Sequence, residues 1–169
     1  MKRGRRLLIP AAAILLAACL NCFFLLNAYV PSGSMEPAIP SGSMVLGNRL
    51  AYGRENPQPG DVVFFHHPEI GERKWLVKRI IAVPGQTFAL CGGRVYIDGK
   101  LLEEAYVEEY SDDTYPETLV PEDRYIVLGD NRRESGDSRT WEEPFVRRED
   151  ILARGICVYF PEFYRLQRN

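Results

Sequence analysis

Positive charge is scarce in most of this 169-residue sequence. Four of its 21 basic residues, Lys2, Arg3, Arg5 and Arg6, precede a long apolar run, which leaves 17 basic against 23 acidic residues in the remainder. The remainder therefore has a formal charge near −6 and offers no basic stripe for a phosphate backbone. Nucleic-acid binding is excluded for this reason, and the length suits one folded domain with a modest core.

Metal-binding patterns are missing as well. The four cysteines, at positions 19, 22, 91 and 157, do not have the spacing of a metal site, and the two histidines stand side by side. His66 and His67 would point to opposite faces of a strand, so we expect them at the surface, without a third ligand. The sequence predicts no metal and no cofactor. Whether Cys91 and Cys157 form a disulfide stays open.

Charge of either sign is absent from Leu7 to Val30. As a helix, this run of about 24 residues would span roughly 36 Å and cross a hydrocarbon core of about 30 Å. The basic residues before it favour the cytoplasmic side of a membrane. We therefore predict a cytoplasmic flank at 1–6, a single transmembrane anchor in the lipid bilayer at 7–30, and an extracytoplasmic domain at 31–169.

Two other interpretations of the N-terminal segment compete with the anchor. A cleavable signal peptide would have a shorter apolar region, of about 7 to 15 residues. Leu16–Cys19 is similar to the lipobox of bacterial lipoproteins, in which Cys19 would carry the lipid, but the chain stays apolar after Cys19 where a polar tether is usual. Length and flanking charge favour the uncleaved anchor.

Helical periodicity is not evident after Val30, and turn-forming residues recur at short intervals, so we predict a mainly β domain. A hairpin turn is expected at Asp98-Gly99. One helical turn is expected at 149–153, and most of 103–123 is interpreted as an exposed connection. The predicted strands cover residues 43–48, 49–52, 62–65, 74–83, 94–97, 100–102, 124–128 and 156–160.

A serine-rich stretch, Tyr-Val-Pro-Ser-Gly-Ser-Met-Glu-Pro at 29–37, follows the apolar run. A serine hydroxyl such as that of Ser34 is a weak nucleophile until a base takes its proton. Lys78 is the candidate base, because its neighbour Arg79 cannot lose a proton at any useful pH. Lys78 would need its pKa lowered by about 3 units from 10.4, and desolvation beside Leu76 and Ile80 can supply this. On the strand pattern alone, a lysine with a buried stem and a solvated head is the alternative.

The Pro-Ser-Gly-Ser-Met sequence occurs twice, at 31–35 and at 40–44, which complicates the choice of serine. The second copy leads directly into an apolar pair, so we expect Ser43 in a turn that enters a strand. The first copy is followed by Glu36-Pro37, which should keep the chain irregular around Ser34.

Four stretches, at 31–37, 59–63, 76–83 and 129–139, resemble in order the sequence boxes of type I signal peptidases. These are membrane-bound Ser-Lys proteases of bacteria that remove signal peptides from exported proteins. The resemblance covers roughly residues 28–160 and implies a compact antiparallel β catalytic domain behind one transmembrane helix. The large extra domain of Gram-negative enzymes has no room here, so the chain is similar to the compact Gram-positive form, located in the bacterial cell membrane.

The resemblance also implies a role for each matching residue. Ser34 matches the nucleophile and Lys78 the general base, while the Ser32 hydroxyl and the Ser34 N–H match the two donors of an oxyanion hole. Ser135 matches the hydroxyl that orients the lysine, and the charged pair that supports the site matches Asp137 and Arg139. The pockets for small substrate side chains would be lined by Val30, Met35, Ile39, Leu76 and Val77.

The implied reaction is acyl transfer to water, with signal peptides of exported preproteins as the substrates. The substrate segment would lie extended along an exposed strand edge. A soluble LexA-like protein that cleaves itself is one alternative, although a membrane anchor argues against it. A non-enzymatic lipoprotein or anchored β-domain is the other, and it requires Ser34 and Lys78 to be incidental.

Overall fold

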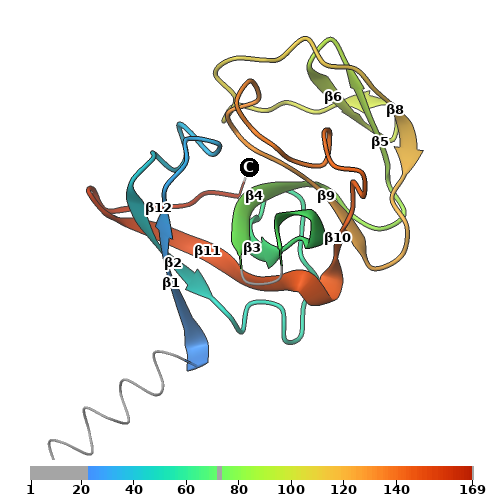
Figure 1. The fold of residues 1–169 in the computed structure, drawn as a ribbon. Coiled ribbons are helices and arrows are strands. Elements are labelled where there is room, and N and C mark those ends of the chain that lie inside the picture. Colours follow the sequence, from blue (N-terminus) through green and yellow to red (C-terminus); the bar gives the residue numbers. More distant parts are fainter. Residues whose placement is uncertain (1–22, 72–73, 169) are drawn as a thin grey trace, which may run out of the picture.

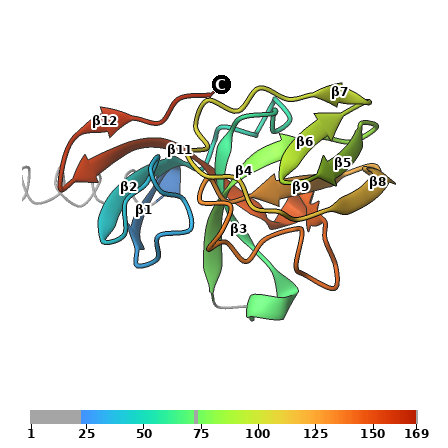
Figure 2. The same ribbon diagram turned by 90° about the horizontal axis from the view of Figure 1, so that it is seen from above.

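The computed structural model describes residues 23–71 and 74–168 of the protein. These residues form two antiparallel sheets (Figure 1). The larger sheet has the order β1-β2-β11-β3-β4-β9-β10, with β12 paired to β11, and the smaller has the order β7-β6-β5-β8. Seen from above, the smaller sheet lies on the opposite side of β3, β4 and β9 from β1, β2 and β12 (Figure 2). The predicted mainly β, antiparallel fold is confirmed for the described residues.

The strands differ widely in length, and two short 3₁₀ turns complete the regular structure. The larger sheet contains β1 (Leu25–Val30), β2 (Ser43–Asn48), β3 (Val62–His66), β4 (Trp75–Ala82), β9 (Arg124–Leu128), β10 (Val146–Arg147), β11 (Ile151–Phe160) and β12 (Tyr164–Arg165). The smaller contains β5 (Thr87–Cys91), β6 (Arg94–Ile97), β7 (Lys100–Leu101) and β8 (Tyr115–Leu119). The 3₁₀ turns are η1 (Pro68–Ile70) and η2 (Arg148–Asp150).

Strand β4 lies at the centre of the packing. It contributes Val77 to the cluster under β1, β2 and β11, Ile80 to a cluster with β3, β9 and β10, and Ile81 to the cluster between the two sheets. The last six residues of β4 are all buried. A polar side chain on this strand is therefore held in apolar surroundings, and this placement determines the chemistry of the site.

The predicted anchor at 7–30 is wrong over its last six residues, because Leu25–Val30 is strand β1. Hydrophobicity alone does not separate a membrane helix from a strand, but these residues alternate between buried and more exposed positions and pair with Ser43–Asn48 in β2. The rest of the anchor before Phe23 and the flank at 1–6 lie outside the described residues. Within the described residues, no helix has the length and apolar character to cross a membrane.

Several shorter predictions can be compared with the structure. The strand at 43–48 and the Asp98-Gly99 hairpin are confirmed, the turn having φ of 52° and 71° at its two residues. The strand predicted at 49–52 is wrong, because these residues form turns. Residues 115–119, predicted as part of a connection, form an exposed edge strand. The helical turn expected at 149–153 ends at Asp150, where β11 takes over.

His67 corrects the surface interpretation of the histidine pair. Its ring is buried, stacks on Trp141 at 4.0 Å between centroids, and has Nε2 3.1 Å from the Glu143 carbonyl oxygen. The burial arises because His67 lies just beyond β3, where the chain turns under the loop that carries Trp141. Cys91 is exposed and Cys157 is buried, and both are free cysteines.

Candidate active site

Ser34 lies in a turn within the connection between β1 and β2, which covers residues 31–42. The turn is closed by the Glu36 N–H, which donates to the Gly33 carbonyl at 3.1 Å, and by an Ile39 N–H to Met35 carbonyl bond of 2.8 Å. Asn131, in the loop after β9, holds the same turn from outside: its Nδ2 donates to the Gly33 carbonyl at 3.1 Å and its N–H to the Ser34 carbonyl at 3.2 Å. The hydroxyl of Ser34 is thereby fixed against the body of the domain.

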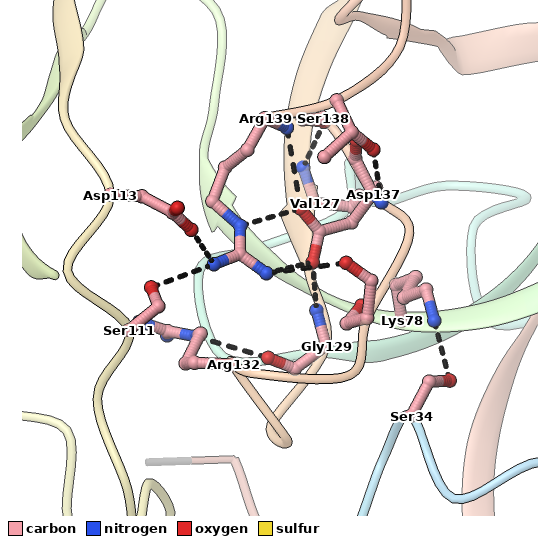
Figure 3. Close-up of polar contacts among 12 residues, drawn as sticks. Ser34, Lys78, Ser111, Asp113, Val127, Gly129, Arg132, Asp137, Ser138 and Arg139 are labelled. Carbon is pink, nitrogen blue, oxygen red and sulfur yellow. Dashed lines mark hydrogen bonds and ion pairs between the residues drawn. The ribbon is translucent and has the colours of Figure 1, made fainter.

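Lys78 approaches Ser34 from the central strand β4. Its Nζ lies 2.5 Å from the Ser34 Oγ, and the two residues are 3% and 8% exposed (Figure 3). The backbone of Lys78 is held in the sheet by its pairing with Val63 in β3. A serine hydroxyl and an amine at this distance can exchange a proton directly.

Burial lowers the pKa of the Lys78 amine to about 8, with desolvation as the main cause. Nearby charges act in opposite directions, because Asp137 and Asp130 raise this pKa and Arg139 lowers it. At pH 7 an amine with a pKa of 8 is neutral in about one molecule in ten, compared with about one in a few thousand for an unperturbed lysine. The solvated-head alternative for Lys78 is therefore wrong, since the amine is buried.

Ser43, in the second copy of the repeat, has a different environment. It is the first residue of β2, follows Gly42 with a φ of +83°, and is completely buried. Its Oγ has no hydrogen-bond partner within the described residues. No base reaches Ser43, and its predicted place in a turn that enters a strand is confirmed.

The loop after β9 surrounds the lysine with fixed charge. Asp137 is fully buried and accepts from Gly129 N–H at 3.0 Å and from the Arg139 Nε at 2.8 Å. The Arg139 guanidinium continues outward to Asp113 at 2.7 Å and to the Ser111 hydroxyl at 3.1 Å (Figure 3). The predicted pair of Asp137 and Arg139 is thus an ion pair in the structure and is part of a longer chain of contacts.

Ser135 lies in the same loop, and its hydroxyl is buried without a hydrogen-bond partner among the described residues. Gly129 packs against it so closely that a Cβ there would collide with the Ser135 hydroxyl and with the Ser34 carbonyl oxygen. Only glycine lets this loop approach the serine turn. The predicted contact between Ser135 and the Lys78 amine is absent from the hydrogen bonds of the described residues.

Two buried ion pairs behind the site escaped the sequence interpretation. Arg79 makes a bidentate pair with Asp130, with bonds of 2.8 and 2.6 Å, and Arg132 makes a bidentate pair with Glu104. Glu104 comes from the segment interpreted as an exposed connection, yet it is 3% exposed. The sequence did contain a signal for the Arg79–Asp130 pair: a buried arginine among the apolar residues of a strand needs a carboxylate partner.

A cleft of about 530 Å³ opens in front of Ser34 and Lys78. Three of the five predicted pocket residues, Val30, Leu76 and Val77, line it. Met35 and Ile39 do not line it; they are fully buried in the same core cluster as Val30 and Val77. The exposed Ser32 does line the cleft, and further lining residues are Tyr29, Pro31, Ile70, Lys74, Trp75, Glu134 and Gly136.

Two strand edges border this cleft. Among the described residues, β1 is the last strand of the larger sheet and pairs with β2. In the same part of the chain, β4 pairs with β9 from Arg79 onward, so Trp75–Lys78 has β3 on one side and no paired strand on the other. Residues 74–78 all line the cleft, which shows that the cleft runs along the edge of β4.

The described residues contain no group of three or more histidine, cysteine or acidic side chains placed to hold an ion. The contact between the buried Lys78 amine and the Ser34 hydroxyl fits a hydroxyl nucleophile activated by an amine.

The signal peptidase family, peptidase S26, matches this sequence over residues 4–160. The chain therefore belongs to this family of serine peptidases. Membership supports a peptidase over a non-enzymatic lipoprotein or a LexA-like regulator.

Two curated relatives support this membership. Probable signal peptidase I-1 of Synechocystis is 35% identical over 155 residues, covering 88% of this chain and 78% of that protein. Signal peptidase I of Bacillus caldolyticus is 31% identical over 175 residues, covering 95% and 92%. A solved signal peptidase I from Enterococcus faecalis matches 59% of this chain and 97% of its own at 30% identity, with a TM-score of 0.49.

Proposed function

We propose that this peptidase removes signal peptides from exported preproteins, with Ser34 as the nucleophile and Lys78 as the general base. The observation that carries the proposal is the 2.5 Å separation of the Ser34 Oγ and the Lys78 Nζ inside a buried environment. A lysine whose pKa lies near 8 takes the serine proton far more readily than one in water.

In the proposed reaction, Ser34 Oγ attacks the scissile carbonyl while its proton moves to Lys78 Nζ. The ammonium then gives that proton to the leaving amine, and a water activated by the same lysine releases the acyl group. The Ser34 N–H has no hydrogen-bond partner within the described residues and Ser32 lines the cleft, which supports their role as oxyanion donors. Two such donors contribute several kcal/mol of transition-state stabilisation, at about 3 kcal/mol each.

The substrate segment is proposed to enter the cleft as an added strand. Trp75–Lys78 lines the cleft and, among the described residues, pairs with β3 on one side only, so its other side offers backbone groups to the added strand. Val30 and Val77 are nearly buried in the cleft wall, so only shallow space is left for the side chains before the cut. This favours small residues at these positions.

The location at a membrane is part of the same proposal. The uncharged run at 7–24 leads directly into β1, whose far end, Val30, lies four residues from Ser34. If that run is embedded in the bilayer with the basic residues 2–6 in the cytoplasm, the catalytic domain is extracytoplasmic and its cleft faces the outer leaflet. A signal peptide that spans the same bilayer would then present its cleavage site at the cleft.

The test is cleavage of a purified preprotein by the full chain, with sequencing of the new N-terminus. We expect the wild type to cut after a small residue, Ser34→Ala and Lys78→Ala to be inactive, and Ser43→Ala to retain activity. Activity in Ser34→Ala combined with loss of activity in Ser43→Ala would show that Ser43, and not Ser34, is the nucleophile. Absence of cleavage in the wild type, with the protein folded and reconstituted in lipid, would refute the function.

A further inference from the structure

The cleft extends beyond the residues that the proposed reaction uses. Ser34, Lys78, Val30 and Val77 account for the part nearest to the nucleophile, yet the same cleft continues to Trp75, Lys74, Ile70 and Tyr29. Its volume of about 530 Å³ is far more than small side chains fill.

The distant part of the cleft has a definite chemical character. Tyr29 is 57% exposed and Ile70 is 36% exposed, so two large apolar side chains are open to a ligand there. Trp75 also lines the cleft, and its ring packs edge-to-face on the core residue Phe64 at 5.4 Å. An apolar wall anchored in this way is preformed, so a ligand can bury surface against it at little ordering cost.

The distance along β4 from Lys78 indicates which residue of an extended substrate would reach Trp75. An extended strand advances about 3.3 Å per residue, so Trp75 lies about 10 Å and Lys74 about 13 Å along β4 from Lys78. A substrate paired to this edge, with the residue before the cut beside Lys78, brings its fourth and fifth residues before the cut to Trp75 and Lys74.

We propose that Tyr29, Ile70 and Trp75 form an apolar subsite that takes a large aliphatic or aromatic side chain four or five residues before the cleaved bond. The inference rests on the proposed function and adds a specificity element to it. The subsite would bind the end of the apolar segment of a signal peptide, while the small-residue pockets fix the cut. Because it lies away from the reacting atoms, it acts mainly through binding of the substrate.

Short soluble peptides with one cleavage site test this subsite without a contribution from membrane binding. The residue at the fourth or fifth position before the cut is varied among Ala, Leu, Phe and Asp in an otherwise constant peptide, and kcat and KM are measured for each. We expect Leu or Phe to raise kcat/KM about tenfold over Ala and more over Asp, chiefly through a lower KM. Equal kcat/KM for all four residues at both positions would overturn the proposal.

The variants Ile70→Ala and Tyr29→Ser test whether these cleft residues cause the preference for Leu or Phe over Ala in the peptide. Either variant should reduce the Leu-to-Ala ratio of kcat/KM from about tenfold to about threefold or less. Leu119→Ala is the matched control, since Leu119 is 62% exposed on β8 in the other sheet, and it should keep the wild-type ratio. An unchanged ratio in both cleft variants would assign the preference elsewhere and refute the subsite.

The two proposals fail in different ways. If Ala peptides are cut by the wild type and not by Ser34→Ala, the proposed function stands whatever the preference at the fourth and fifth positions. If the peptides and a full preprotein are both left intact by folded enzyme, the proposed function itself fails.

Discussion

Lys78 and Arg79 are consecutive residues of β4, and both cations are buried, with exposed fractions of 3% and 2%. Arg79 donates four hydrogen bonds, two to the Asp130 carboxylate and two to backbone carbonyls. Lys78 has no carboxylate partner within the described residues and contacts the Ser34 hydroxyl instead. Strand alternation sends the two side chains to opposite faces and so into these two environments.

The comparison shows how one strand can hold two buried cations in different ways, one in a structural ion pair and one as the proposed base. The guanidinium of Arg79 binds Asp130 through two hydrogen bonds and so holds the loop after β9 in place. An unpaired amine in apolar surroundings gives up its charge more easily, so the pKa of Lys78 falls. The difference lies in the partner each residue meets, and it can be tested by changing each residue in turn.

The largest expected effect is on catalysis. Lys78→Met and Lys78→Arg should both lower kcat by about 10³-fold, because methionine cannot accept a proton and arginine does not release its own. Lys100→Met, in the exposed β7, should behave as the wild type. Preprotein cleavage at constant enzyme concentration measures the effect. Substantial activity in Lys78→Arg would show that Lys78 does not act as a base.

The second effect is on stability. Arg79→Met leaves the Asp130 carboxylate buried without its partner and should lower the free energy of unfolding by about 3–5 kcal/mol. Urea denaturation followed by circular dichroism measures it. The double variant Arg79→Met with Asp130→Asn should recover part of the loss, since the uncompensated charge is gone. A loss below about 1 kcal/mol in Arg79→Met would contradict the structural role of the Arg79–Asp130 ion pair, and with it the contrast between Arg79 and Lys78.

The third effect is the pH dependence of stability. Because the folded state lowers the Lys78 pKa from 10.5 to about 8, the unfolded chain binds more protons between these values, and stability should rise with pH across them. Because of this shift, the free energy of unfolding should be lower by about 3 kcal/mol below pH 8 than above pH 10.5. Lys78→Met should therefore be more stable than the wild type at pH 7, and its stability should lack this rise. Parallel curves for the two proteins would contradict the lowered pKa.

The smallest effect concerns Ser135, whose buried hydroxyl has no partner within the described residues. Ser135→Ala removes an unsatisfied polar group, so the free energy of unfolding should stay constant or rise by about 1 kcal/mol. If the hydroxyl orients the Lys78 amine during the reaction, kcat should fall about tenfold in the same variant. Unchanged kcat would remove Ser135 from the site, and a large loss of stability would show that it has a structural partner.

Sequence reasoning selected Ser34 and Lys78 as the candidate reactive pair because both residues carry unusual local signals. Ser34 lies in a proline-bounded stretch after an apolar run, and Lys78 is a cation in an apolar strand. Each signal alone fits ordinary structural roles, and the ordered boxes were needed to connect two residues 44 positions apart. The structure adds the distance between their side chains, which depends on how β4 packs against the β1–β2 turn.

The misassigned parts of the fold have physical causes. The apolar composition of Leu25–Val30 fits a membrane helix and a buried strand equally well, and only its pairing with β2 decides. Tyr115–Leu119 contains a proline and an acid, which are tolerated because this strand lies at a sheet edge. Glu104 is buried because Arg132 neutralises it, and no local pattern indicates that partner.

The pH dependence of kcat/KM for a peptide substrate, measured from pH 6 to 11, tests the central claim most directly. The base must be neutral to accept the Ser34 proton, so the rate should rise with pH and level off above a midpoint near 8, the pKa of the buried Lys78. A midpoint near 10.5, or a rate independent of pH over this range, would contradict the claim that burial of Lys78 activates Ser34.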